Sequence, residues 1–144
     1  MQRTIRQARQ RLEELADTLN PMSFKRLNDE LKAAEAEATR AAHDHAAKKT
    51  DSLMRQRNEV LRRLCETRDA FNGLAGEGKA GRISGKDYAA RYAALKAEER
   101  RLHGVVENVT SGLAAVTAIE EDPVAYADAN FYDRYPATRP DFTF

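Results

Sequence analysis

Disulfide bonds, membrane spans and secretion signals are absent from this sequence. Cys65 is the only cysteine among the 144 residues, so no disulfide can form within the chain. No apolar run is long enough to span a membrane, and no basic stretch followed by an apolar one marks a secretion signal. We therefore expect no membrane partner, and a location in the cytoplasm or in a particle assembled inside the cell.

Aromatic residues are also scarce, and neither sign of charge is in clear excess. The chain has no tryptophan, and aromatics make up 7% of it. Its 24 basic and 23 acidic residues leave a net charge of +1, so no global field attracts nucleic acid or an anionic membrane. Charged residues still make up 33% of the chain, and Ala, Glu, Arg and Leu are frequent, as is typical of long helices. This composition predicts an elongated, all-α protein.

Residues 1–20 are predicted to form a basic amphipathic helix. Apolar residues recur at steps of three and four from Thr4 to Leu19, which places them on one helical stripe. Pro21 ends this helix, because it disfavours the α conformation at the residue before it. Asn20 is expected to cap a second helix with Pro21 at its first position.

The second helix should run from about Pro21 to about Ala70, since neither glycine nor proline interrupts that stretch. Its apolar stripe has a different heptad phase in its two halves. The change falls in residues 45–52, which contain five consecutive residues without an apolar side chain. A stutter, kink or break is expected there.

Residues 72–85 contain five glycines and are predicted to form a loop. Ser84 and Asp87 have the spacing of a capping box and should start the third helix, which carries about four heptads in register. Residues 21–122 are therefore expected to form an antiparallel helical hairpin or coiled coil of two or three helices. The predicted seam residues are Leu27, Leu31, Leu53, Val60, Leu64, Tyr88, Tyr92, Leu95, Leu102, Val106, Val109, Leu113 and Val116.

The stretch from Leu64 to Leu95 runs through Gly-Arg-Ile-Ser into a helix with the pattern Tyr-x-x-x-Tyr-x-x-Leu. It resembles the short helix-turn-helix segments that are common in bacterial and phage proteins. The resemblance covers about a fifth of the chain. It implies a helical hairpin and nothing about activity.

Three patterns suggest chemistry, and the residues argue against each. The segment from Gly73 to Ala80 is one residue short of a P-loop, but it lacks the hydroxyl after Lys79 and follows a helix rather than a strand. His43 and His45 point about 200° apart on a helix, which leaves only a site shared between symmetry-related chains. Cys65 has no adjacent histidine or second cysteine. We expect no catalytic, cofactor-binding or metal-binding residue, and no enzyme.

Four arginines, and no acidic residue, lie in the first eleven positions and could contact phosphates. No aromatic residue is interleaved with them for base stacking, and the known DNA-reading patterns are missing. Nucleic-acid binding by the first helix is therefore kept as an alternative, against a solvated surface or an acidic protein partner. The residues concerned are Arg3, Arg6, Arg9 and Arg11.

Residues 123–144 contain six of the ten aromatics and three of the four prolines, which predicts an extended, irregular tail. Exposed aromatics are unfavourable and are common anchors of interfaces, so we expect the tail to dock on a protein partner. The alternative is that it folds back over the chain's own helices. The predicted partner-binding residues are Tyr126, Phe131, Tyr132, Tyr135, Phe142 and Phe144.

Narrow apolar stripes on two or three helices leave much of the seam wet, which favours a homo-oligomer or an obligatory partner. We interpret the sequence as a non-catalytic structural or adaptor protein that self-associates through coiled-coil helices and docks through its aromatic tail. A short helical chain with an extended docking tail is also typical of components of larger assemblies, such as a bacteriophage particle.

Overall fold

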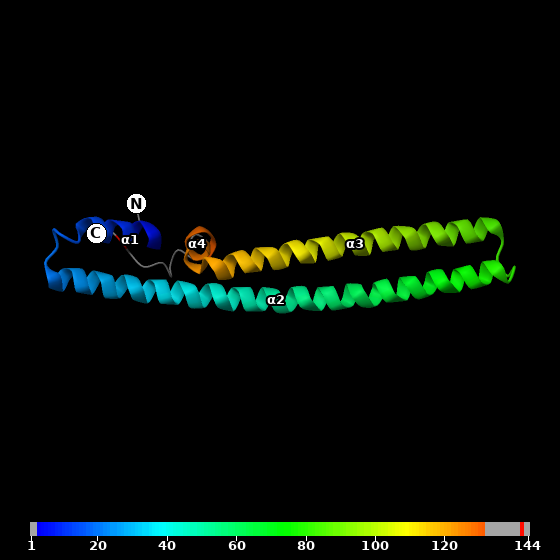
Figure 1. The fold of residues 1–144 in the computed structure, drawn as a ribbon, viewed down its shortest axis with the longest axis horizontal. Helices are drawn as coiled ribbons and strands as arrows, with labels where there is room; N and C mark the ends of the chain where they lie inside the picture. Colours follow the sequence, from blue (N-terminus) through cyan, green and yellow to red (C-terminus); the bar gives the residue numbers. More distant parts are fainter. Residues whose placement is uncertain (1–2, 132–141, 143–144) are drawn as a thin grey trace. The chain divides into compact units, whose positions relative to one another are not determined.

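The computed structural model describes residues 3–131 and 142 (Figure 1). These residues form helices and turns, with no strand among them. The elements in chain order are α1 (Ile5–Leu15), α2 (Pro21–Lys79), α3 (Gly85–Glu121), α4 (Pro123–Tyr126) and the π-helix η1 (Ala127–Phe131). The predicted all-α hairpin, in which two long helices pack against each other, is confirmed.

The chain divides into two compact units. Unit 1 combines Met1–Lys49 with Val116–Phe144, and unit 2 is the continuous stretch Thr50–Ala115. The long helices α2 and α3 contribute to both units. Unit 1 also contains α1, α4 and η1, whereas unit 2 consists of two helices and the turn between them.

The core of unit 1 forms where α1 packs on the first part of α2. The buried face of α1 meets a stripe of small residues on α2, so the two helices can approach closely. Leu19, Phe24, Leu27 and Val124 pack around this core. Its buried members are Ile5, Ala8, Leu12, Leu31, Ala34, Ala38, Ala127 and Phe142.

Local hydrogen bonds begin and end the helices of unit 1. Thr4 forms a capping box with Gln7 at the start of α1. The helix ends at Leu15, earlier than predicted, and the hydroxyl of Thr18 donates to its last carbonyl at 3.0 Å. The predicted cap of α2 is confirmed, because the side chain of Asn20 accepts from the amide of Ser23 at 2.8 Å.

Helix α2 continues without interruption through residues 45–52. Of the three predicted outcomes, a break is wrong, whereas the spacing of the buried positions does change, as a stutter would change it. In unit 1 they follow steps of three and four residues as Leu31, Ala34, Ala38, Ala42 and Ala46. In unit 2 they recur every seven residues as Val60, Thr67 and Leu74. An α-helix can carry both spacings, because each differs only slightly from its 3.6-residue period.

The predicted loop at residues 72–85 is shorter than expected, because α2 continues to Lys79 and α3 begins at Gly85. Interior glycines cost a helix only about 1 kcal/mol each, which packing elsewhere along α2 can offset. The helix ends in a Schellman motif, in which Arg82 donates to the carbonyl of Glu77 at 3.1 Å and Gly81 has φ 67°. Ser84 then caps α3 by accepting from the amide of Asp87 at 3.2 Å, as predicted.

The predicted irregular tail begins as helix, since α4 and η1 together cover residues 123–131. Asp122 caps α4 by accepting from the amide of Ala125 at 3.2 Å, and Pro123 occupies the first helical position. Both residue types favour the start of a helix. The tail prediction gave weight to its aromatics and prolines and overlooked this start signal.

Replacing Gly81 and Gly104 by alanine should have opposite effects on stability. Gly81 lies in the left-handed region, where an alanine costs about 1 kcal/mol. Gly104 lies inside α3, and beyond its own helix backbone no atom of the described residues would lie within 4 Å of an added Cβ, so Gly104→Ala should stabilise the protein by about 0.5–1 kcal/mol. Urea denaturation should give a lower midpoint for Gly81→Ala and a higher one for Gly104→Ala. Shifts of the same sign would contradict the left-handed turn.

Candidate interaction surfaces

Phe142, a predicted anchor for a partner, lies in the core of unit 1. Its side chain is 3% exposed and belongs to the apolar cluster that includes Ile5, Ala8 and Leu12. A side chain buried this deeply in its own chain is not available to another protein. The prediction is corrected for Phe142, which follows the alternative in which the tail folds back over its own helices.

Tyr126 is half-buried and stacks on His45 of α2, with 5.4 Å between ring centroids and an interplanar angle of 24°. This contact also lies within unit 1. The side chain of Phe131, and all of Tyr132, Tyr135 and Phe144, lie outside the described residues. Their role in binding a partner stays a prediction.

Asp128 of η1 makes structural contacts that the sequence did not predict. It is 8% exposed, and its carboxylate accepts from the amide of Ile5 at 2.9 Å and from that of Arg6 at 3.3 Å. The hydroxyl of Thr4 accepts from the amide of Gln7, and the side chain of Gln7 accepts from the amide of Thr4. The four amides that a helix leaves without internal partners are thus all bonded at α1. A carboxylate at this end also interacts favourably with the helix dipole.

Arginines of α1 pair with carboxylates of the same chain. Arg6 pairs with Asp122, which precedes α4. Arg9 forms a two-pronged contact with Glu35 of α2 at 2.9 and 3.0 Å, and it donates to Asn28 at 2.7 Å. The hydrogen bonds to Glu35 raise the pKa of Arg9. These contacts hold α1 in place within unit 1.

The same pairing bears on the predicted phosphate contacts. Arg6 and Arg9 are engaged as described, and Arg11 pairs with Glu14 at 3.3 Å. Each of these carboxylates neutralises the arginine beside it and would repel a phosphate. Arg3 also takes part in an interaction. The geometry of α1 therefore gives no support to a nucleic-acid surface.

The predicted seam residues differ in how far they are covered. Most of the apolar stripe of unit 2 is only half-buried, and Tyr92 is 42% exposed. Thr67 and Leu74 are buried seam residues that were not predicted. Thr67 has a polar side chain, and Leu74 lies in the glycine-rich stretch that was predicted to be a loop. The fully buried predicted residues are Leu31, Val60, Leu102, Val109 and Val116. The half-buried ones are Leu27, Leu53, Leu64, Tyr88, Leu95, Val106 and Leu113.

Aromatic rings gather on one side of the hairpin in unit 2. Phe71 of α2 meets Tyr92 of α3 edge to face, with 5.5 Å between centroids, and Tyr88 stacks on Tyr92 at 6.3 Å. The ammonium group of Lys96 lies 5.4 Å from the centre of the Phe71 ring. Gly78 allows this packing, since a Cβ there would lie 3.1 Å from the ring of Tyr88.

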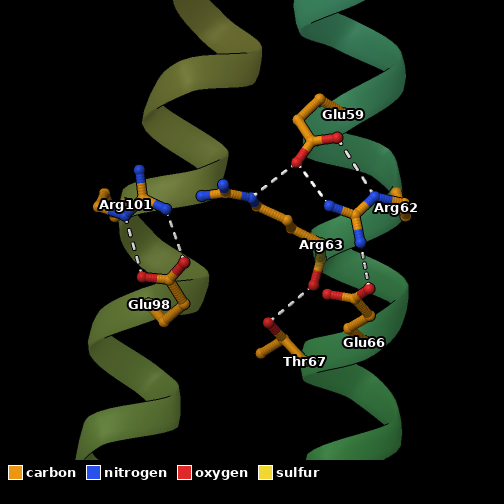
Figure 2. Close-up of polar contacts among 7 residues, drawn as sticks. All are labelled: Glu59, Arg62, Arg63, Glu66, Thr67, Glu98 and Arg101. Carbon is orange, nitrogen blue, oxygen red and sulfur yellow. Dashed lines mark hydrogen bonds and ion pairs between the residues drawn. The ribbon is translucent and has the colours of Figure 1, made fainter.

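Charged side chains line both helices of unit 2 near Val60 and Leu102. Figure 2 shows Arg62 between Glu59 and Glu66 on α2, and Arg63 reaching from α2 toward α3. Hydrogen bonds from Arg62 and Arg63 lower the pKa of Glu59. Exposed pairs of this kind are screened by water and contribute little to stability.

A separate charged pair lies on the facing helix α3 (Figure 2). Glu98 accepts from Arg101 at 2.6 and 2.9 Å, and this contact lowers the pKa of Glu98. The positive charge of Arg63 on the other helix lowers it further. The charge of Arg63 on α2 is thus felt at Glu98 on α3, although the two side chains form no ion pair among the described contacts.

Chemically reactive side chains do not converge in the described part of the chain. His43, His45 and His103 are exposed, and no group of three His, Cys, Asp or Glu among residues 3–131 and 142 could hold a metal ion. Cys65 is also exposed. The P-loop-like stretch lies mainly inside α2, where backbone amides bond within the helix instead of cradling a phosphate.

None of the described helices combines the length and apolarity needed to cross a membrane. Comparisons of the chain with protein-family models, with curated proteins and with solved structures found no match.

Phe142→Ala should destabilise the isolated chain by about 3 kcal/mol, because it leaves a cavity in the core of unit 1. Urea denaturation measures the loss. Tyr92→Ala is the control, and it should cost less because Tyr92 is 42% exposed. If Phe142→Ala kept the wild-type stability, Phe142 would not be a core residue and its predicted role as a partner anchor would be restored.

Asp122→Asn should weaken the dependence of stability on pH. Hydrogen bonds from Arg6 and from the amide of Ala125 lower the pKa of Asp122 below its ordinary value of 3.8. A lowered pKa means that the stabilisation is complete above that ordinary value and is lost as the pH falls through the folded-state pKa. An asparagine keeps the acceptor for Ala125 but removes the charge.

The measurement is urea denaturation of both proteins at about pH 5 and about pH 3, a range that spans the carboxylate titration. The wild type should lose more stability than Asp122→Asn over this range. Other carboxylates titrate in both proteins, so the difference reports on Asp122. Equal losses would contradict the pair with Arg6.

Proposed function

We propose that this chain is a non-catalytic structural or adaptor protein that self-associates through its long helices and docks on a protein partner through aromatic residues of its C-terminal segment. One observation supports self-association above the others: the apolar stripe of unit 2 is incompletely covered. The seam residue Tyr92 is 42% exposed, several other seam residues are half-buried, and Leu61 next to the seam residue Val60 is 43% exposed. Two helices alone cover such a stripe poorly, and helical proteins usually complete it with further helices.

Unit 1 shows what such completion looks like. There the equivalent surface of α2 is covered by α1 and by residues of the C-terminal segment, including Phe142. Its stripe residues Leu31, Ala38 and Ala46 are at most 1% exposed. The described part of unit 2 has no such third element. A second chain could supply it.

Docking on a different protein is proposed for the aromatics of the C-terminal segment other than Phe142. In the sequence, Tyr132 and Tyr135 lie between Asp128 and Phe142, which both pack against other residues of unit 1. Tyrosines are frequent interface anchors, because one ring combines apolar area with a polar hydroxyl. A component of a larger assembly, such as a bacteriophage particle, would use both surfaces.

The non-catalytic part of the proposal rests on the hollows of the hairpin. Three hollows in unit 2 are lined by apolar residues, glycines, a threonine, a tyrosine and charged side chains, and none of their lining residues is serine, cysteine or histidine. Glu77 and Arg91, which line one of them, pair with each other at 3.1 Å. Such a surface offers contact area, whereas catalysis needs reactive groups converging in a closed site.

Size-exclusion chromatography with light scattering tests the proposal. The full chain should elute with a mass at least twice that of its 16.2 kDa monomer over a wide concentration range. The variant Tyr132→Ser, Tyr135→Ser should keep this mass, because the proposal gives these tyrosines a foreign partner. A monomer at every concentration would contradict self-association, and dissociation of the tyrosine variant would reassign the tail to self-assembly.

A further inference from the structure

One side of the hairpin in unit 2 carries aromatic rings next to a hollow at the turn. Phe71 of α2 and Tyr88 of α3 both pack on Tyr92, as described above. Tyr88 also lines a hollow of about 430 Å³, together with residues that include Gly78 and Ile83. We call the surface formed by the three rings and this hollow the aromatic face.

The aromatic face is packed together but not covered. Tyr92 is 42% exposed, and Phe71, Tyr88 and Ile83 are half-buried. Exposed aromatic rings are unfavourable in water, and they are frequent anchors of protein interfaces. The aromatic face therefore offers apolar contact area to another element.

Cations border the aromatic face. Lys79 lines its hollow, and Arg68 lies one helical turn before Phe71 on the same side of α2. Both side chains are exposed, and neither forms an ion pair among the described residues. Lys96 adds a third cation, with its ammonium group 5.4 Å from the centre of the Phe71 ring. Two of the three positive charges are thus free to meet a carboxylate from outside.

Carboxylates of the same chain do not balance these cations. Glu99 pairs with Lys96 at 3.4 Å. Glu77 lines a different hollow, where it pairs with an arginine at 3.1 Å. Asp69 follows Arg68 in the sequence but lies about 100° farther round the helix, away from the rings. The aromatic face therefore carries more positive than negative charge, which favours an acidic partner.

Unit 1 shows which kind of element covers such a surface. There the amphipathic helix α1 packs its apolar stripe on α2, and Arg9 of α1 forms a two-pronged contact with Glu35 of α2. The aromatic face also combines apolar area with charge, but the charge has the opposite sign. An amphipathic helix with carboxylates beside its apolar stripe fits it.

The charges argue against a second copy of this chain on the aromatic face. About a two-fold axis the same cations would meet each other, and like charges at short range repel. Helix α1 of another copy is itself basic, with arginines at positions 6, 9 and 11. Single-stranded nucleic acid needs rings that are free to stack on bases, whereas Tyr88 and Tyr92 stack on each other.

We infer that the aromatic face binds an acidic amphipathic helix of a different protein. One apolar side chain of that helix enters the hollow at the turn, and its carboxylates pair with Arg68 and Lys79. The bound helix becomes the third helix of unit 2, as α1 is in unit 1. This inference goes beyond the proposed function, because it gives the partner a surface separate from the C-terminal segment.

A pair of synthetic peptides tests the inference on the full chain. The acidic peptide has about 20 residues, with leucines at the a and d positions of about three heptads and glutamates at the flanking positions. Its twin has lysines in place of the glutamates. Isothermal titration calorimetry should give the acidic peptide a Kd at least about tenfold lower than that of the twin. Equal affinities, or no binding of either peptide at about 1 mM, would overturn the inference.

Charge reversal locates the binding site. The double variant Arg68→Glu, Lys79→Glu should weaken binding of the acidic peptide at least about tenfold and strengthen binding of the lysine twin. The matched control is Arg55→Glu, Lys86→Glu, which makes the same change of charge at two exposed cations of unit 2 that point away from the rings. The control should keep both Kd values within about twofold, and circular dichroism should show both variants folded. If the control lost as much affinity, the attraction would be general and the inference would be overturned.

Tyr92→Ala separates this inference from self-association. It should weaken binding of the acidic peptide at least about tenfold, because it removes an anchor, and it should leave the mass found by light scattering unchanged. A fall in mass would place a second copy on the aromatic face and overturn the inference. A wild-type chain that is a monomer and binds the acidic peptide as expected would overturn self-association alone. Tighter binding of a single-stranded oligothymidine than of the acidic peptide, lost in Arg68→Glu, Lys79→Glu, would also overturn the inference.

Discussion

Two packed helices can bury only a narrow stripe of each other, and this geometric limit decides what each unit of the chain requires. In unit 1 the limit is overcome within the chain, because α1 and Phe142 cover the small residues of α2. In unit 2 only the centre of the stripe is buried, at residues such as Val60, Leu74 and Leu102. One architecture therefore gives one unit that is complete and another that presents apolar surface.

Completion of unit 1 depends on polar contacts as well as on apolar ones. A short helix such as α1 is not stable alone in water, because too few residues share the cost of nucleation. Here the carboxylate of Asp128 bonds to its first amides, Arg9 ties its middle to Glu35, and Arg6 pairs with Asp122. Its apolar face is then held against α2, so the helix gains its stability from tertiary contacts.

The sequence was informative where a pattern is local. The stripe from Tyr88 to Val116 and the caps at Asn20 and Ser84 depend on residues within a few positions, and they predicted α3 and two helix starts. The glycines of residues 72–85 predicted a loop that is longer than the one observed, because a well-packed helix tolerates glycine in its interior. Asp128 and Phe142 could not be placed from the sequence, since their partners are over a hundred residues away and are brought together only by the fold.

The bond between Asp128 and Ile5 has a consequence for the order of folding during synthesis, since the two residues are 123 positions apart. α1 leaves the ribosome early, but the carboxylate that completes its first turn is made only after all of α2 and α3. Unit 2 is one continuous stretch and can close its hairpin before unit 1 is complete. Until Asp128 is made, the first amides of α1 lack their acceptor, although the residues of α2 that cover its apolar face are already present.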